Sequence, residues 1–213
     1  MFNPSSVVIE AFLVELRLKY SNLFGPNTDN TQLLISAARN ALEIIANSDA
    51  PYHDMNHTIM VTMVGTEILG GKFLVEGSIN ERDWIHFVIS LLHHDIGYVR
   101  GICQADCSGR YAINDDETIS LAPGATDAAL TPFHVDRAQL YIRERFLRDD
   151  RVDADIICSN IERTRFPVPS EKDHQETSDL PGLLRAADLI GQLADPQYIN
   201  KVSRLFAEFS ETG

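Results

Sequence analysis

The feature that most constrains this chain is the sequence LLHHDIG at residues 91–97, which ends an apolar segment that begins at Trp84. The apolar segment predicts a buried helix. Two imidazoles and a carboxylate at the end of such a helix cost free energy unless something binds them. Imidazole and carboxylate are good ligands for divalent zinc, iron, manganese and magnesium. We therefore ask whether other histidines and aspartates converge on His94-Asp95.

Apolar residues recur along the chain at spacings of three and four, which predicts an all-α fold of roughly eight helices. No convincing hairpin, internal repeat or linker is found, so residues 1–213 are expected to form one domain with its motifs within 52–192. The irregular stretch 98–131 follows the candidate metal motif directly and predicts a rim or lid loop. The expected helices span residues 4–20, 32–47, 53–69, 81–95, 133–148, 152–164, 180–193 and 196–209.

Capping residues predict where several of these helices begin. Asn80 is expected to cap the helix that carries His94, and Ser178 the helix from residue 180. Asn30 or Thr31 is expected to cap the second helix, and Thr131-Pro132 to start the fifth. Gly70-Gly71 is expected to end or weaken the third helix.

The composition limits the partners of this protein. A formal net charge of -13 weighs against nucleic acid or an anionic membrane surface as the main partner. The same charge would repel a phosphate substrate unless bound metal cations reverse the field locally. A homo-oligomer and a monomer are both compatible with the sequence.

The expected location is the cytoplasm. No apolar run approaches the ~20 residues that a membrane-spanning helix needs, and no secretory signal is found. The three cysteines are an odd number without a disulfide framework, and we expect free thiols: Cys103, Cys107 and Cys158.

Three groups of residues are candidates for metal binding. His53 and His57 are four residues apart, so both lie on one face of a helix that includes them. His94-Asp95 is the second group. Asp188 is the third, because it lies in an otherwise apolar helical segment where a carboxylate needs a cation, hydrogen-bond donors or a metal. Each group taken alone also has a structural interpretation, as a capping pair, a hydrogen-bonded pair or a paired carboxylate.

The order of these groups, His57, then His94-Asp95, then Asp188, resembles the H…HD…D pattern of the HD superfamily of metal-dependent phosphohydrolases. YHDMNH at residues 52–57 resembles the Y-H-x-x-x-H segment of its cyclic-nucleotide phosphodiesterase branch. HDIG at 94–97 resembles the H-D-I/V-G step, and AADLIGQ at 186–192 resembles the final A-D helix. The chain departs from that branch after His94-Asp95, where it lacks a further histidine followed by glycine. The resemblance implies a compact helical bundle of the HD-domain or PDEase-like type.

The resemblance also implies a role for each matching residue. His57, His94, Asp95 and Asp188 would bind the metal, and Asp95 would also contact a second metal if two are bound. His53 would be the general acid that protonates the leaving oxygen, because an imidazole can hold a proton near neutral pH. A water activated by the metal would be the nucleophile. One or two divalent ions are implied, with manganese, magnesium, zinc, iron and nickel as candidates.

Two further residues are secondary candidates. His134 follows His94-Asp95 on the next expected long helix, as a histidine that binds the second metal would. Alternatively, His134 is a surface residue in the first turn of that helix. Arg165, close to Glu162, could bind a phosphate through the forked donors of its guanidinium. Alternatively, Arg165 lies at a solvated helix end. Structural roles are expected for four other residues. His86 is expected to be a hydrogen-bonded helix histidine and His93 a core neighbour of the ligands. His174 is expected to be an exposed loop residue and Asp54 a helix cap.

The expected function is therefore that of a metal-dependent phosphohydrolase that cleaves a phosphate ester bond of a nucleotide or a related small phosphoester. One alternative is a non-catalytic HD-type module that binds a nucleotide or a metal as a regulator. Such modules usually lose a ligand, whereas all four are present here. Another alternative is a di-iron HD oxygenase, which needs more histidine ligands than the pattern assigns.

Overall fold

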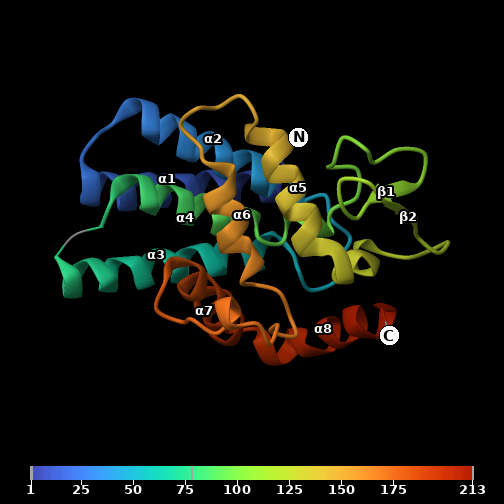
Figure 1. Ribbon diagram of the computed structural model, residues 1–213. Coiled ribbons are helices and arrows are strands. Elements are labelled where there is room, and N and C mark those ends of the chain that lie inside the picture. Colours follow the sequence, from blue (N-terminus) through green and yellow to red (C-terminus); the bar gives the residue numbers. More distant parts are fainter. Residues whose placement is uncertain (1, 78, 213) are drawn as a thin grey trace.

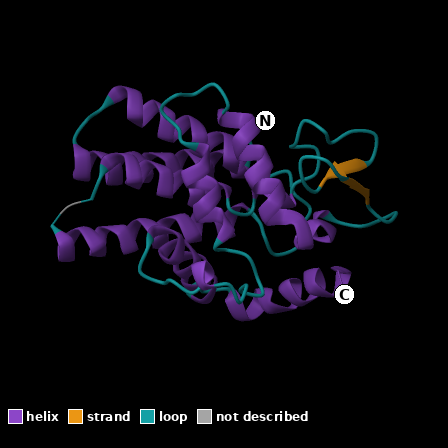
Figure 2. Ribbon diagram, viewed as in Figure 1, coloured by secondary structure: helices purple, strands orange, loops and turns teal. Residues whose placement is uncertain are grey.

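The computed structural model describes residues 2–77 and 79–212, and it is built almost entirely from helices (Figure 2). The described residues form eight α-helices, three short 3-10 helices and one two-stranded sheet, which confirms the all-α prediction. Residues 1, 78 and 213, which the expected domain includes, lie outside the described residues. The α-helices are α1 (Pro4–Phe24), α2 (Thr28–Ile45), α3 (Met55–Glu76), α4 (Glu81–His93), α5 (His134–Phe146), α6 (Ala154–Glu162), α7 (Leu180–Leu193) and α8 (Tyr198–Thr212).

Helix α3 lies in the middle of the bundle, between α4 on one side and α7 on the other (Figure 1). Helix α2 packs against α1 and α4, and α5 packs against α6. The core between these helices contains fully buried Leu16, Leu34, Trp84, Leu91 and Leu184. Complete burial of a large aliphatic side chain stabilises a fold by about 1.5–3 kcal/mol. The core therefore holds α3, α4 and α7 in fixed relative positions.

Two glycines allow backbone segments to approach closely near the centre of the fold. A Cβ atom at Gly191 of α7 would lie 2.9 Å from the Cα atom of Val61 in α3. A Cβ atom at Gly97 would lie 1.9 Å from the carbonyl oxygen of His134. Because real Cβ atoms do not approach so closely, only glycine lets α7 lie against α3 and lets the segment after Asp95 pack on α5.

The central prediction for α4 is confirmed. Asn80 caps the helix, since its side-chain oxygen accepts the backbone N–H of Arg82. Every residue from Trp84 to His93 is buried. Helix α7 begins at Leu180 and ends at Leu193 as expected, but its cap is Asp179 and not Ser178, because the Asp179 side chain accepts the backbone N–H of Gly182.

Other predicted helix ends are wrong. Helix α1 continues to Phe24, and α2 already begins at Thr28 because Asn27, not Asn30 or Thr31, is its cap. The Asn27 side chain accepts the backbone N–H of Asn30. Capping residues in the short polar loop thus compete, and sequence alone does not choose between them.

Helix α3 continues through Gly70-Gly71 to Glu76, although these glycines were expected to end or weaken it. A glycine inside a helix costs only about 1 kcal/mol relative to alanine. The helix ends instead at Gly77, whose positive φ of 76° provides a left-handed cap.

The region between α4 and α5 contains more structure than expected. After the 3-10 helix η1 (Ile96–Tyr98), strand β1 (Arg110–Ala112) pairs antiparallel with β2 (Thr118–Ser120), so the expectation of no hairpin is wrong. Strands of three residues are too short to give a periodic signal. Thr131-Pro132 does not start α5, because both residues lie within the 3-10 helix η2 (Asp127–Phe133), which Thr126 caps.

By length and composition alone, α3 is long and apolar enough to cross a membrane, which the search for uninterrupted apolar runs did not predict. Core helices of water-soluble proteins meet the same criteria. Helix α3 packs against α4 and α7, and its buried face carries polar His57, Thr58 and Thr62. This face of α3 therefore belongs to the core, and 33% of the most apolar 18-residue window of the helix is buried.

Candidate metal centre

The four residues expected to bind a metal come together between α3, α4 and α7. His57 lies in the first turn of α3, His94 and Asp95 follow the last residue of α4, and Asp188 lies on α7. His57 Nε2 is 3.2 Å from Asp188 Oδ1 and 3.3 Å from Asp95 Oδ2. His94 Nε2 is 3.0 Å from Asp95 Oδ2 and 3.6 Å from Asp188 Oδ1.

Local hydrogen bonds orient the two imidazoles. His94 Nδ1 donates to the carbonyl oxygen of Leu91, so the lone pair of Nε2 faces the carboxylates. Asp54 caps α3 as expected, because its side chain accepts the backbone N–H of His57. The close packing of α7 on α3 at Gly191 brings Asp188 to the same point.

The donor atoms of this cluster fit a metal ion. His57 Nε2, His94 Nε2 and Asp95 Oδ2 are buried and make no well-formed hydrogen bond within the described residues, although they lie close to one another. A buried polar atom without a partner costs about 1–3 kcal/mol. The His57, His94 and Asp188 donors lie within 4.8 Å of one another. Two imidazole nitrogens with carboxylate oxygens form a mixed donor set that suits zinc, iron or manganese.

The ionisable groups of the cluster depend strongly on one another. Burial lowers the pKa of His57, but contacts with Asp188 and Asp95 outweigh it and raise that pKa to about 9. His94 behaves in the same way, with burial opposed by the charge of Asp95, and its pKa is well above the usual value. Burial raises the pKa of Asp95, but the neighbouring His94 lowers it well below the usual range. A divalent cation would therefore replace the protons of the two imidazoles.

His53 lies close to the candidate ligands, but not on the helix predicted to carry it. It is not on the face of a helix with His57, because α3 begins at Met55 and Asp54 is its cap. Even so, the ring centroids of His53 and His57 are 5.4 Å apart. His53, His57 and Asp95 form a second cluster of potential ligands.

Glu208 of α8 is a site residue that sequence reasoning missed. It is 1% exposed and accepts the backbone N–H of Tyr52 at 2.5 Å and that of His53 at 3.1 Å. Its other oxygen lies 2.5 Å from His53 Nδ1. Burial raises the pKa of Glu208, but its contacts with His53 and the backbone of Tyr52 together outweigh burial and lower that pKa. The available signal was a glutamate inside the apolar sequence LFAEF at residues 205–209.

The structure does not bring His134 into either ligand cluster. His134 Nδ1 donates to the carbonyl oxygen of Thr131 at 2.6 Å. The ring of Tyr98 lies between His134 and His53, with centroids 4.6 Å and 4.5 Å away. Burial lowers the pKa of His134. His134 lines the cavity, on the opposite side of Tyr98 from His53.

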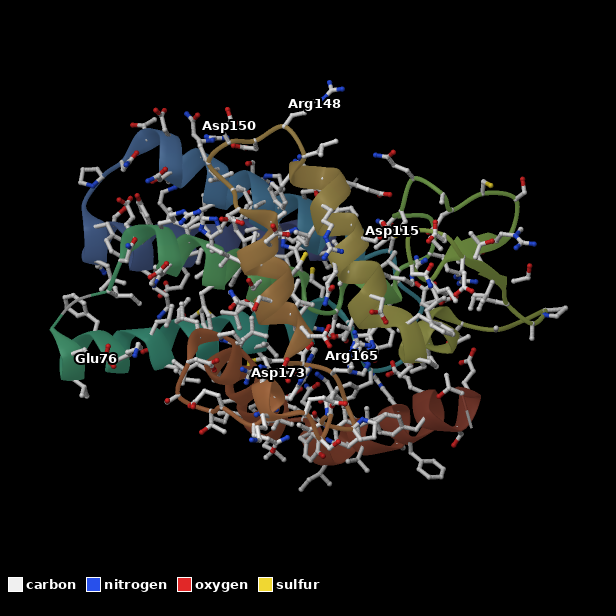
Figure 3. All side chains as sticks on the ribbon, in the orientation of Figure 1. Glu76, Asp115, Arg148, Asp150, Arg165 and Asp173 are labelled. Carbon is white, nitrogen blue, oxygen red and sulfur yellow. The ribbon has the colours of Figure 1, made fainter. Side chains whose placement is uncertain are left out.

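Arg165 lies close to the end of α6, above α8 (Figure 3). Its guanidinium makes hydrogen bonds to both carboxylate oxygens of Asp136 and to both of Glu162, so each of its three nitrogens is engaged. Arg185 of α7, which the sequence did not single out, donates only from Nη1, to the carbonyl oxygen of His174, among the described residues. Arg185 therefore has more donor capacity left for an anion than Arg165 has.

A cavity of about 360 Å³ opens above the candidate metal centre. Asp95 and Asp188 lie at its floor, His53 lines it beside them, and Arg165 and Arg185 contribute positive charge. Of the expected lid loop 98–131, only Tyr98 and Thr131 line this cavity. Its walls are mostly apolar and come from the segment after α6 and from α7 and α8: Phe166, Val168, Leu189, Leu205 and Phe209. The size and lining suit a small organic molecule.

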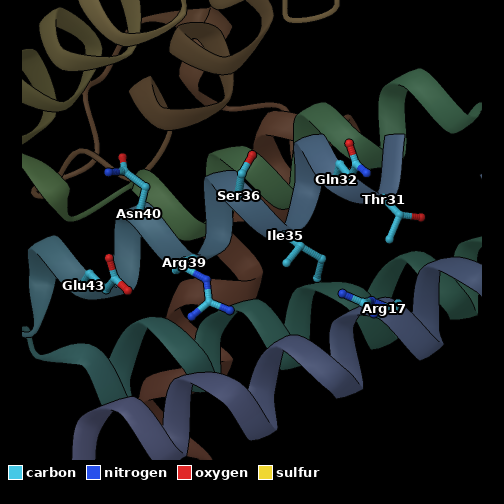
Figure 4. A pocket seen from close by; sticks show the side chains of 8 residues that line it. All are labelled: Arg17, Thr31, Gln32, Ile35, Ser36, Arg39, Asn40 and Glu43. Carbon is cyan, nitrogen blue, oxygen red and sulfur yellow. The ribbon is translucent and has the colours of Figure 1, made fainter. Parts of the chain in front are cut away.

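A second hollow, of about 380 Å³, lies between α1 and α2 (Figure 4). Its charged residues are Arg17, Arg39 and Glu43, and both terminal guanidinium nitrogens of Arg39 donate to Glu10. Neither of the ligand clusters found among the described residues lies there. We therefore place the candidate chemistry in the cavity above Asp95.

The remaining histidines have structural roles. His86 is satisfied as expected, because its Nε2 accepts the backbone N–H of Asp153 at 2.7 Å. Burial lowers the pKa of His93 to about 4, so it is a neutral core residue. His174 is not an exposed loop residue, since it lies half-buried in the 3-10 helix Lys172–His174, 3.3 Å from Glu162.

The cysteines are free thiols, as expected: Cys103, Cys107 and Cys158.

Comparisons with known proteins assign the chain to a family. Its sequence matches the model of the Npun_R2479-like family over residues 2–213. No curated protein and no solved structure matches it. Because the family match covers almost the whole sequence, the chain belongs to the Npun_R2479-like family.

Proposed function

We propose that this protein is a metal-dependent phosphohydrolase of the HD type, which cleaves a phosphate ester bond of a nucleotide or a related small phosphoester. The observation that carries the proposal is the convergence of His57, His94, Asp95 and Asp188, of which Asp95 and Asp188 line a cavity. Their order along the chain is the H…HD…D order of that superfamily. The all-α fold and the free thiols agree with an HD-type domain in a reducing cytoplasm.

One divalent cation, or two, would activate a water molecule and neutralise phosphate oxygens. His57, His94, Asp95 and Asp188 would hold the cation, because their donor atoms already face one another without a competing hydrogen bond. Asp95 lies close to His57 and His94 and also belongs to the cluster with His53, and its carboxylate has two oxygens, so Asp95 would contact a second cation if two are bound. The rigid packing of α3, α4 and α7 keeps the ligands in place.

His53 is the proposed general acid. The Glu208 carboxylate accepts from His53 Nδ1, so the proton that His53 would transfer is on Nε2. Tyr98 stacks on the imidazole with an interplanar angle of 12° and restricts its rotation. This arrangement orients His53 towards the cavity, where it would protonate the leaving oxygen of the ester.

The lining of the cavity supports a small phosphoester as substrate. The free donors of Arg185 would bind phosphate oxygens, while Arg165 is engaged with Asp136 and Glu162. The apolar walls would bind an organic group such as a nucleobase. The net charge of -13 makes a nucleic acid or an anionic membrane an unfavourable partner.

The test is a phosphatase and phosphodiesterase screen on chelator-stripped protein that is reloaded with manganese, magnesium, zinc, iron or nickel. Nucleotides, cyclic nucleotides and aryl phosphates are the substrates. We expect hydrolysis that requires a metal, that Asp188→Asn abolishes, and that the matched surface variant Asp173→Asn retains. Metal-independent hydrolysis, or equal activity in Asp188→Asn, would contradict the proposal. Two redox-active irons without hydrolysis would favour the oxygenase alternative, which the second cluster around His53 also suits.

A further inference from the structure

Helix α8 has its polar and apolar faces reversed. Its buried residues are the charged Lys201 and Glu208, whereas four large apolar residues face the solvent. A surface helix normally turns its apolar stripe inward and its charges outward. The exposed residues, which we name the α8 seam, are Ile199 (88% exposed), Val202 (45%), Phe206 (72%) and Phe209 (43%).

Polar contacts hold α8 in this orientation. Glu208 binds the backbone of Tyr52 and His53, and the Lys201 ammonium is 2.6 Å from a carboxylate oxygen of Asp195. Glu211 accepts the backbone N–H and the hydroxyl of Thr126. Helix α8 packs chiefly on η2 and lies along the lower edge of the molecule (Figure 1). These contacts fix the inward face, so the apolar face cannot be buried by a simple rotation of the helix.

The spacing of the α8 seam is that of a helix-pairing surface. Its residues are separated by three, four and three positions, which is the a and d pattern of a heptad. The flanking e and g positions carry no charge at all: Tyr198, Ser203, Leu205, Ser210 and Thr212. In a chain with a net charge of -13, two copies repel each other over most of their surface, and an uncharged seam is where they can meet.

The seam is also complementary to itself in the antiparallel direction. A twofold axis at position 204 places Ile199 opposite Phe209 of a second copy and Val202 opposite Phe206 of a second copy. Each of these a–d pairs then combines an aromatic ring with a β-branched side chain. Such an isologous contact closes after two copies.

The apolar surface extends beyond α8. A standard interface buries ~800 Å² per partner, so a stable dimer needs neighbouring surface as well. Phe166 and Leu189 are 71% and 49% exposed, and they line the same cavity as Phe209. An anionic membrane is a poor alternative occupant, because Lys201 faces inward and Arg204 is the only other basic residue of α8.

We propose that the α8 seam pairs with the α8 seam of a second copy of this chain. The two helices are antiparallel, and the twofold axis passes through the seam at the level of residue 204. The proposal does not depend on the proposed hydrolase activity. Its first test is the mass of the full-length protein in solution, measured by light scattering and sedimentation equilibrium over a range of concentrations. The wild-type protein should be a dimer at tens of micromolar, and Phe206→Glu should weaken dimerisation at least tenfold.

Leu74→Glu is the matched control, because Leu74 is an apolar residue of similar exposure in the last turn of α3. It should leave the dimer intact. Circular dichroism checks that the variants fold, and Ile199→Glu replaces Phe206→Glu if the latter does not. A monomeric wild-type protein at 100 micromolar, or dimers that persist in both seam variants, would overturn the proposal. So would binding of a monomeric wild-type protein to phosphatidylcholine vesicles.

Cross-linking tests the direction of pairing. Cys107, the exposed native cysteine, is first changed to serine. Ile199→Cys and Phe209→Cys proteins are then oxidised separately and as a mixture. Antiparallel pairing predicts a cross-linked dimer only in the mixture. Cross-linking of each variant with itself would contradict the antiparallel arrangement.

Discussion

The floor and the rim of the cavity are built in different ways. The floor residues His57, His94, Asp95 and Asp188 come from helices that pack through the main core, and close packing at Gly191 sets their spacing. We call α8, the segment around residues 164–168 and His53, which Glu208 of α8 holds, the rim of the cavity. Polar contacts hold the rim in place, and large apolar side chains remain exposed on it. Under the proposed function, the core would position the metal ligands, whereas α8 would position the proposed acid His53 and shape the entrance of the cavity.

The largest expected effect is at the floor. Asp95→Asn removes a charge from the centre of the cluster and should abolish turnover. It should also weaken metal binding by more than the ~10–100-fold that loss of an outer contact to a ligand costs. Calorimetric titration with manganese and zinc measures this, with Asp173→Asn as the surface control. Unchanged metal affinity in a folded Asp95→Asn protein would show that the ligands are assigned wrongly.

His53→Ala tests the rim. This variant should retain the metal but lose about 10²–10⁴-fold in kcat, most severely for esters with poor leaving groups. The measurement is kcat for a series of aryl phosphates with leaving groups of different pKa, together with the metal content. If His53→Ala loses the metal instead, His53 is a ligand and the distinction between floor and rim fails at this residue.

Glu208→Gln should have a smaller effect of the same kind. Glutamine keeps the shape of the side chain but removes the carboxylate that accepts from His53 Nδ1. We expect a lower kcat, an unchanged metal affinity and a displaced acidic or basic limb in the pH–rate profile. A reduced Tm with an unaltered pH profile would instead assign Glu208 a purely structural role in anchoring α8.

Gly191→Val tests the floor without changing a ligand. The added Cβ would lie 2.9 Å from Val61 Cα, so α7 must move away from α3. Overpacking of this kind costs about 1–3 kcal/mol of stability, and displacement of Asp188 should weaken metal binding. Gly70→Ala is the control, because no atom lies within 4 Å of its added Cβ and alanine stabilises a helix by about 1 kcal/mol. Equal metal affinities in the two variants would argue against control by core packing.

The last prediction concerns the pH dependence of the stability of the metal-stripped protein. The pKa of His57 is raised to about 9, so its contribution to stability is complete below ~6.5 and is lost as the pH rises through about 9. The pKa values of Asp95 and Asp188 are lowered, so their contribution is present above ~4 and is lost on acidification. The Tm of the stripped protein should therefore fall between pH 6.5 and 9, and bound metal should remove this fall. A flat Tm over that range would contradict the coupling.

The sequence predicts the floor better than the rim, for a physical reason. Apolar periodicity identified α4 and α7, and polar residues inside those patterns identified His94, Asp95 and Asp188, because burial of such groups demands a partner. Glu208 and Arg185 were missed because their roles depend on contacts with segments far away in the sequence. The argument that His53 and His57 share a helical face is wrong, since α3 begins only at Met55, and the role expected of His53 rests on the resemblance of residues 52–57 to the HD pattern. The caps Asn27 and Asp179 show that neighbouring polar residues compete for helix starts on small energy differences.

The most direct test is an anomalous-diffraction measurement on crystals of the protein loaded with manganese. The account predicts a strong anomalous peak ~2 Å from His57 Nε2 and His94 Nε2, in contact with Asp95 and Asp188. Absence of that peak at saturating manganese, or a peak only at the acidic surface residues 115–117, would contradict a metal centre at the floor of the cavity.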